Sequence, residues 1–429
     1  MKIPGVLCIL FLLFSNGYLQ STQIFASQKP VKSKSSDLAL VGAKIYPSPA
    51  EKPIEKGVIV IQNGKISAVG ELGKVKLPPK INRLDCTGMT ITAGFWNCHV
   101  HFTELKWEES QTLPAPQLTA QLQEMLTRYG FTSVFDTGSY WEITSALRHR
   151  IESGEVDGPR IFTTGEIIFP KNGVPPVEAV KASGGIARPM PAAETTEQAV
   201  QLAKQKLKAG TDGIKLYAQT FWNPNLKIPV DIIKAVTAEA HRQQKPVFVH
   251  PSNQYGLEAA IESGVDVLVH TTPQTSPWDA GIVARMKQAK MALVPTLTLW
   301  HVELEREGAP PEDQKGFQTK GVNQLRAYFQ AGGQILFGTD VGYIPVYDTT
   351  EEFEQMERAG MRFPDILAAL TTAPAGRFGK PNQTGKISVG TLADLVVLKA
   401  DPATNVTALS QVKYTLRNGK IVFQSQDQK

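Results

Sequence analysis

The chain has 429 residues, of which 42% are hydrophobic and 20% are charged, and its formal net charge is +5. This length allows a large core and more than one domain, and the composition is that of a globular protein. Because the lysines and arginines are interspersed with acidic residues and form no basic block, the sequence does not indicate nucleic-acid binding.

The first residues form a segment of their own. MKIPGVLCILFLLFSNG carries one lysine and then an apolar run from Val6 to Phe14, which is too short to span a bilayer as a helix. The pattern predicts a secretory signal peptide over residues 1–26, cleaved after Gly17 or Ala26, and export to the periplasm or the outside. An uncleaved anchor is the alternative; after cleavage we expect no membrane association.

Two cysteines, Cys86 and Cys98, follow this leader. Two cysteines do not make a disulfide framework. We therefore expect buried thiols, and a single bridge between them stays open.

Two segments at opposite ends of the chain have the same pattern of apolar and polar residues. Residues 38–90 and 385–424 alternate apolar and polar side chains between turn signals such as Gln62-Asn63-Gly64, which indicates short antiparallel strands. RNGKIV at 417–422 also repeats QNGKIS at 62–67. Since chain termini often lie close together, we predict that these segments pair into one small β-sandwich domain.

Between them, residues 91–384 alternate short apolar runs with helical stretches. The runs are ITAGFWNCHVHF, FTSVFDTG, RIFTTGEII, DGIKLYAQ, PVFVHP, VDVLVHTT, ALVPTLTLW and QILFGTDVG. APQLTAQLQEMLTRYG, TEQAVQLAKQKLKAG and VDIIKAVTAEAHRQQ have helical periodicity, and Gly130, Gly210 and Gly264 stand where helices are expected to end. This alternation predicts an α/β fold, a parallel (β/α)8 TIM barrel. A doubly wound open sheet is the alternative, although no glycine-rich phosphate loop follows the first run.

Polar side chains stand where these strands are expected to end, which is where such barrels carry their catalytic groups. They are His99, His101, Lys215, His250, His270 and Asp340. His99 and His101 share one strand face, so both imidazoles can bind one ion, whereas Cys98 and Val100 are expected to face the helices. Neutral imidazole suits zinc, and manganese, iron and nickel stay open.

Lys215 stands between the apolar residues Ile214 and Leu216. A lysine ammonium has no lone pair for a metal, but a buried lysine beside cations loses its proton. The neutral amine can react with carbon dioxide to give a carbamate whose two oxygens bridge two metal ions. A lysine that reaches solvent is the alternative.

Taken together, the HxH pair, IKLY, VHPSNQYGLEAAIESGVDVLVHT, LFGTD and LADLVVLKADP resemble the amidohydrolase superfamily. The resemblance extends over residues 38–424 and is to binuclear members of the imidazolonepropionase-like and Xaa-Pro dipeptidase-like groups. Relatives often have HAHG where this chain has HPSN, and EHG where it has VHT followed by TPQ. Neither difference removes a ligand, but both change the surroundings of the site.

The resemblance implies a cofactor and a set of ligands. Two divalent metal ions, zinc first, would be held by His99, His101 and Asp340 on one side and by His250 and His270 on the other, with carboxylated Lys215 (N6-carboxylysine formed from carbon dioxide) as the bridge. It also implies hydrolysis of a C–N amide bond by a metal-bridged hydroxide, in which Asp340 takes the proton and delivers it to the leaving nitrogen.

Four further residues are candidates for substrate binding. Tyr217 shares the face of Lys215 and could donate to the developing oxyanion, with a core aromatic as the equal alternative. Arg188 could pair with a substrate carboxylate, although a solvated loop arginine is the more common case, and Tyr343 and His301 are candidates for lining the pocket. His149 and His241 are expected on helix surfaces.

The sequence thus predicts a hydrolase of a small molecule such as a dipeptide or an N-acyl amino acid. A mononuclear deaminase or cyclic-imide hydrolase, and a lactonase or phosphoesterase on the same scaffold, are alternatives. Mononuclear relatives usually lack the lysine at the position of Lys215. A non-catalytic binding protein is least consistent with the complete ligand set, and a homo-oligomer stays open.

Overall fold

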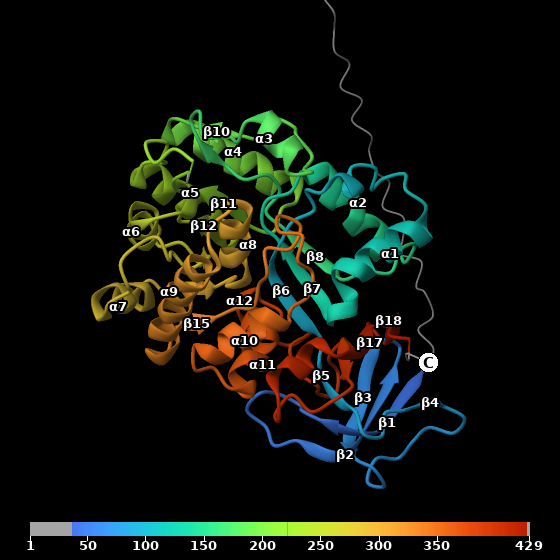
Figure 1. Cartoon of the computed structure of the whole chain (residues 1–429). Helices are drawn as coiled ribbons and strands as arrows, with labels where there is room; N and C mark the ends of the chain where they lie inside the picture. Colours follow the sequence, from blue (N-terminus) through green and yellow to red (C-terminus); the bar gives the residue numbers. More distant parts are fainter. Residues whose placement is uncertain (1–36, 221, 427–429) are drawn as a thin grey trace, which may run out of the picture. The chain divides into compact units, whose positions relative to one another are not determined.

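A computed structural model describes residues 37–220 and 222–426 of the chain. The predicted signal peptide, residues 1–26, lies outside these residues. Within them, helices and strands alternate through the middle of the chain, so the fold is α/β (Figure 1). None of the helices in the described part is both long and apolar enough to cross a membrane.

The largest sheet has eight strands and takes them from both ends of the chain, as Figure 1 shows by its blue and red strands side by side. The order is β18-β17-β16-β5-β1-β2-β3, and β4 pairs with β1. The strands are β1 Leu38–Ile45, β2 Ile54–Gln62, β3 Lys65–Glu71, β4 Asn82–Asp85, β5 Thr90–Ala93, β16 Leu395–Leu398, β17 Val412–Arg417 and β18 Lys420–Gln424. One apolar cluster, including Leu40, Ile59, Ile91 and Leu395, lies within this sheet and so joins the two chain ends.

The two repeated NGK sequences form hairpin turns that lie against each other. Asn63 and Gly64 have φ angles of 50° and 76°, and Asn418 and Gly419 have 49° and 75°. A Cβ on Gly64 would lie 2.9 Å from the carbonyl oxygen of Asn418, so glycine is needed there both for its φ angle and for this close approach.

The eight predicted barrel strands all form, in two parallel sheets. β6 Phe95–Val100, β7 Phe131–Asp136 and β8 Arg160–Thr163 make one. β11 Ile214–Tyr217, β12 Val247–His250, β13 Val267–Val269, β14 Ala292–Val294 and β15 Gln334–Ile335 make the other. Two parallel bridges, Ile168 with Leu216 and Val100 with Val341, link the margins of these sheets.

The first apolar run is not one strand, as the sequence suggested, but two. β5 belongs to the eight-stranded sheet and β6 to a parallel sheet, with Gly94 between them. The amide of Gly94 donates to the carbonyl of Asp394 at 2.8 Å, and a Cβ at this position would lie 2.2 Å from Oγ1 of Thr132. Glycine therefore lets the chain pass from one sheet to the other where a larger residue would collide.

The helices follow the periodicity of the sequence. The three predicted ones form as α1, α4 and α5, and Gly130, Gly210 and Gly264 all have positive φ angles where helical segments end. α4 begins with a capping box formed by Thr195 and Gln198. The α-helices are α1 Ala115–Met125, α2 Trp141–Glu152, α3 Val177–Ala182, α4 Thr196–Ala209, α5 Val230–Arg242, α6 Gln254–Glu262, α7 Ala280–Gln288, α8 Thr298–Arg306, α9 Pro311–Gln330, α10 Thr350–Arg358, α11 Phe363–Leu370 and α12 Thr372–Arg377.

Short elements complete the described chain. The 3-10 helices are η1 Leu105–Trp107, η2 Thr127–Tyr129 and η3 Val406–Ser410, and a two-stranded sheet is formed by β9 Phe169–Pro170 and β10 Ala192–Ala193.

Cys86 and Cys98 are buried and free, as expected. Val100 packs in the large cluster that includes helix residues. Cys98 instead belongs to a cluster of residues from other parallel strands, such as Phe135 of β7 and Phe248 of β12, so its predicted orientation toward the helices is wrong. The pairing of β6 with β7 is irregular between Asn97 and Val100, which breaks the strict alternation on which that prediction depended.

Candidate metal centre

The structure places the six predicted ligand positions at the carboxyl ends of parallel strands. His99 lies on β6 and His101 directly after it, Lys215 lies on β11, His250 ends β12, and His270 follows β13. Asp340 follows β15 after a short extension. All six are buried except His250, which is partly exposed.

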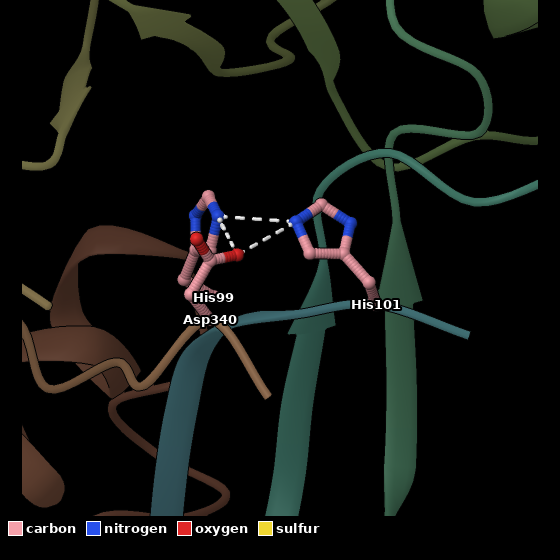
Figure 2. A group of neighbouring side chains, drawn as sticks. All are labelled: His99, His101 and Asp340. Atoms are coloured by element: carbon pink, nitrogen blue, oxygen red, sulfur yellow. Dashed lines mark hydrogen bonds and ion pairs between the residues drawn. The ribbon is translucent and has the colours of Figure 1, made fainter. Parts of the chain in front are cut away.

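Three of these side chains converge on one point, as Figure 2 shows. Nε2 of His99 and Nε2 of His101 are each 3.0 Å from Oδ1 of Asp340, and the two nitrogens are 3.2 Å apart. Apart from these two nitrogens, Oδ1 of Asp340 has no polar partner among the described residues, and it is buried. Two imidazole nitrogens and a carboxylate oxygen that converge in this way fit a divalent cation.

The other two imidazoles continue from this group in a row of edge-to-face contacts. The ring of His270 is 4.8 Å from that of His99, and the ring of His250 is 4.6 Å from that of His270. Nε2 of His270 lies 4.0 Å from Oδ2 of Asp340. The row therefore extends from the His99–His101–Asp340 group across the ends of β13 and β12.

Burial sets the protonation of these groups. It lowers the pKa of His99 to about 3 and those of His250 and His270 well below the usual value. Burial alone would raise the pKa of Asp340, but the neighbouring imidazoles, His99 first, hold it well below its usual range. His99, His250 and His270 are thus neutral and the carboxylate of Asp340 is ionised at neutral pH, which is the state in which these groups bind metals.

Lys215 is 1% exposed on a strand whose neighbours in sequence are both fully buried. Burial lowers the pKa of its amine to about 7, partly opposed by the negative charge of Asp340. A large share of this amine is therefore neutral and nucleophilic near neutral pH.

The backbone around the site adopts unusual conformations. His270 and Asp340 have φ angles of 78° and 64°, and Thr296, which contacts His270, has 46°. Residues other than glycine rarely adopt this region, and such strain of roughly 1–3 kcal/mol each tends to occur at functional sites.

Three polar residues that the sequence did not single out hold the predicted ligands. Oγ1 of Thr137, after β7, is 3.0 Å from Nδ1 of His99, and Oγ1 of Thr296, after β14, is 2.6 Å from Nδ1 of His270. Nδ2 of Asn97 donates to Thr339 at 2.7 Å and so connects β6 to the residue before Asp340. Thr137 and Thr296 directly follow predicted strands. This position is the one sequence signal from which their role could have been predicted.

The four predicted substrate-binding residues lie in different surroundings. Tyr217 is buried and stacks on His250 with 3.9 Å between ring centres. Tyr343 is 42% exposed, and its hydroxyl donates to Glu303 at 3.2 Å. Arg188 and His301 each pair with an acidic side chain. Arg188 lies 3.2 Å from Glu108, and His301 lies 2.8 Å from Glu351.

His149 and His241 are exposed on α2 and α5, as expected. His241 pairs with Asp266 at 2.8 Å, outside the metal centre.

Comparison with known proteins gives this geometry a context. The chain is 25% identical over 447 aligned residues to an ochratoxinase of Aspergillus niger, an alignment that spans 94% of this chain and 90% of that protein. The crystal structure of a Xaa-Pro dipeptidase with bound methionine superimposes with a TM-score of 0.76 at 22% identity, covering 91% of this chain and all of that one. Molinate hydrolase gives a TM-score of 0.74 at 19% identity over 90% of this chain and 95% of that one.

These similarities agree on the fold, which is α/β with a TIM-barrel-like domain. The model of the amidohydrolase family matches residues 90–422, which include every residue of the candidate metal centre. The chain therefore belongs to the amidohydrolase family, and it is a metal-dependent hydrolase that acts on carbon–nitrogen bonds.

Proposed function

We propose that this protein hydrolyses the C–N amide bond of a small peptide-like molecule, a dipeptide or an N-acyl amino acid, at a site built for two divalent metal ions. The observation that carries the proposal is the convergence of His99, His101 and Asp340, with the buried Oδ1 of Asp340 between two imidazole nitrogens. The relatives named ochratoxinase and Xaa-Pro dipeptidase support an amide substrate.

The ligand set divides into two groups. His99, His101 and Asp340 would hold one ion, and His250 and His270, which follow them in the row of rings, would hold the other. Zinc is the proposed metal because neutral imidazoles dominate the donor set. When bound, the ions lower the pKa of water and polarise the substrate carbonyl.

Lys215 is proposed to carry a carboxyl group that bridges the two ions. The neutral Nζ lone pair forms a bond to the carbon of carbon dioxide, the nitrogen loses one proton, and the product is a carbamate anion with two oxygens. The lowered pKa of about 7 supports this step because the neutral amine is the reactive form.

Asp340 is proposed as the acid and base. Its carboxylate is ionised in the resting site, so it can accept a proton from the attacking water and return it to the leaving nitrogen. Burial raises the pKa of Tyr217 well above its usual value, so its phenol keeps the proton that it would donate to the oxyanion. Arg188, Tyr343 and His301 remain proposed pocket residues.

The finer description of the fold belongs to the same proposal. We propose that the bridges Ile168–Leu216 and Val100–Val341 close the parallel strands into a (β/α)8 barrel, residues 91–384, and that residues 38–90 and 385–424 form a separate β-sandwich domain. Export directed by residues 1–26 is proposed from the sequence pattern alone.

Metal content of the purified protein tests the proposal. We expect about two zinc equivalents in the wild type, one or none in Lys215→Ala, and near-wild-type content in Asp340→Glu. Asp340→Asn cannot carry the proton, and its kcat should fall about 10²–10⁴-fold while KM changes little. One equivalent in both the wild type and Lys215→Ala would refute the bridged site and favour a mononuclear deaminase or cyclic-imide hydrolase.

A further inference from the structure

A buried carboxylate on α10 contacts neither the predicted metal ligands nor bulk solvent. Glu352 is 1% exposed, and its described hydrogen bonds are to the amide of Leu297 at 2.8 Å, the amide of Thr298 at 2.8 Å and Oγ1 of Thr298 at 2.9 Å. It thus binds the first free amides of α8, the helix that starts at Thr298. Burying a carboxylate costs desolvation free energy, so a carboxylate buried away from the metal ligands is expected to have a specific role.

The turn that Glu352 holds also carries Thr296. This β-branched residue has a φ angle of 46°, a conformation that needs support from its surroundings. Glu352 supplies that support on the carboxyl side of Thr296, and Nε2 of Gln318 adds a contact to the carbonyl of Leu297 at 3.4 Å.

The hydroxyl of Thr296 lies where it can select which nitrogen of His270 carries the proton. Its Oγ1 lies 2.8 Å from the carbonyl of Pro295, which can only accept, and 2.6 Å from Nδ1 of His270. A hydroxyl has one proton, so once it donates to Pro295 it can only accept from Nδ1–H. In that arrangement Nδ1 carries the proton and Nε2, which lies 4.0 Å from Oδ2 of Asp340, keeps its lone pair for a metal.

We propose that Glu352 is a positioning residue of the metal site: it fixes the 295–298 turn so that Thr296 holds His270 in the tautomer and orientation needed to bind a metal through Nε2. This inference rests on the proposed role of His270 as a ligand. Glu352 reaches His270 only through Thr296, so the two residues must act as one unit.

Selective ¹⁵N labelling of histidine tests the proposal in the full chain after removal of metal with a chelator. Long-range ¹⁵N–¹H NMR distinguishes the two tautomers, and loss of one signal in His270→Gln assigns that ring. We expect a single tautomer with the proton on Nδ1 in the wild type and in Thr296→Ser. Thr296→Val and Glu352→Gln should both give a mixture of tautomers. Glu354→Gln, an exposed acid on the same helix, is the matched control and should keep the wild-type signal.

Zinc titration of the same proteins gives a second readout. Thr296→Val and Glu352→Gln should each weaken the more weakly held zinc about 10–100-fold. The double variant should be no weaker than Thr296→Val alone, because both changes break the same connection. If Glu352→Gln does not fold, Thr298→Val can replace it, because it removes one of the three hydrogen bonds to the carboxylate. This variant should give a smaller shift in the tautomers of His270 and a smaller loss of zinc affinity.

Two results would overturn the proposal: a wild-type tautomer in Glu352→Gln, or a double variant whose loss of zinc affinity is the product of the two single losses. Failure of the proposed function would look different. A wild type that binds one zinc would remove the second ion, whereas the NMR comparison would still show whether Glu352 and Thr296 set the tautomer of His270.

Discussion

At position 215 a lysine lies on a parallel strand with its amine enclosed among the proposed ligands. Desolvation disfavours the ammonium more than the charge of Asp340 favours it, and the pKa falls from 10.5 to about 7. The same burial lowers the pKa of His99 to about 3. At the scale of single residues, exclusion of water therefore keeps the imidazole of His99 neutral and converts the amine of Lys215 from a cation toward a neutral nucleophile.

This pKa has a consequence for the stability of the metal-free protein. Below about pH 7 the lysine is protonated in both the folded and the unfolded chain, and the folded chain bears the full cost of the buried charge. Above pH 10.5 it is neutral in both, so its unfavourable contribution disappears between these values, with ~5 kcal/mol as an upper limit.

We therefore expect Lys215→Met to be more stable than the metal-free wild type at pH 7, and the difference to shrink as the pH rises toward 10. Urea unfolding of both proteins across this pH range measures it. A difference in unfolding free energy that stays constant with pH would show that burial does not lower the pKa of the Lys215 amine. Exposed Lys208→Met should show no such pH-dependent gain.

At the scale of elements, the site depends on where strands stop. The chain leaves β5 for β6 at Gly94, and this change of sheet brings His99 and His101 to the same edge as Asp340. The irregular pairing between Asn97 and Val100 then orients β6 differently from a regular strand. A short run of apolar residues thus contains two strands, β5 and β6, that pair in different sheets.

Gly94→Ala should destabilise the protein by about 1–3 kcal/mol, because its Cβ would lie 2.2 Å from Oγ1 of Thr132. Denaturant unfolding gives the change in free energy. Thr132→Ala in the same chain should restore part of the loss, since it removes the atom that collides. Gly316→Ala on α9 meets nothing within 4 Å and should be neutral or slightly stabilising. Equal losses in both glycine variants would contradict the steric explanation.

At the scale of the whole described chain, the two ends are held together and to the parallel strands. Asp394, just before β16, accepts from Arg160 of β8 at 3.0 Å and from the amide of Asn418 at 2.8 Å. Its carbonyl accepts from the amide of Gly94, which lies between β5 and β6. This one buried residue therefore connects the eight-stranded sheet to the strands that carry the site.

Asp394→Ala should lower the free energy of unfolding by about 3–5 kcal/mol, because it leaves the largely buried Arg160 and the amide of Asn418 without their partner. Thermal and denaturant unfolding measure the loss. Glu194→Ala removes an exposed pair with Lys171 and should change stability by less than ~1 kcal/mol. A change for Asp394→Ala as small as that of Glu194→Ala would show that this contact does not hold the ends together.

Much of this arrangement is predictable from the sequence because it depends on local patterns. Each of the eight apolar runs contains one parallel strand, the first of them with β5 before it, three periodic stretches form α1, α4 and α5, and each NGK sequence forms a hairpin turn. Polar side chains at the ends of buried strands pointed to the edge where His99, His101 and Asp340 meet. The spacing of apolar residues, the residues required by a turn and the presence of an imidazole at the end of a buried strand can all be recognised within a short segment of sequence.

What the sequence alone determined, then, is the class of fold and the residues that form the candidate centre. The tertiary structure decided which side chains hold those residues in place. Thr296 and Glu352 are separated by 56 positions along the chain, and neither belongs to a motif. Yet Thr296 contacts His270, and Glu352 binds the residues that follow Thr296. Hydrogen bonds between distant segments depend on distances of a few tenths of an ångström, which periodicity does not encode and which only the packing of the complete chain determines.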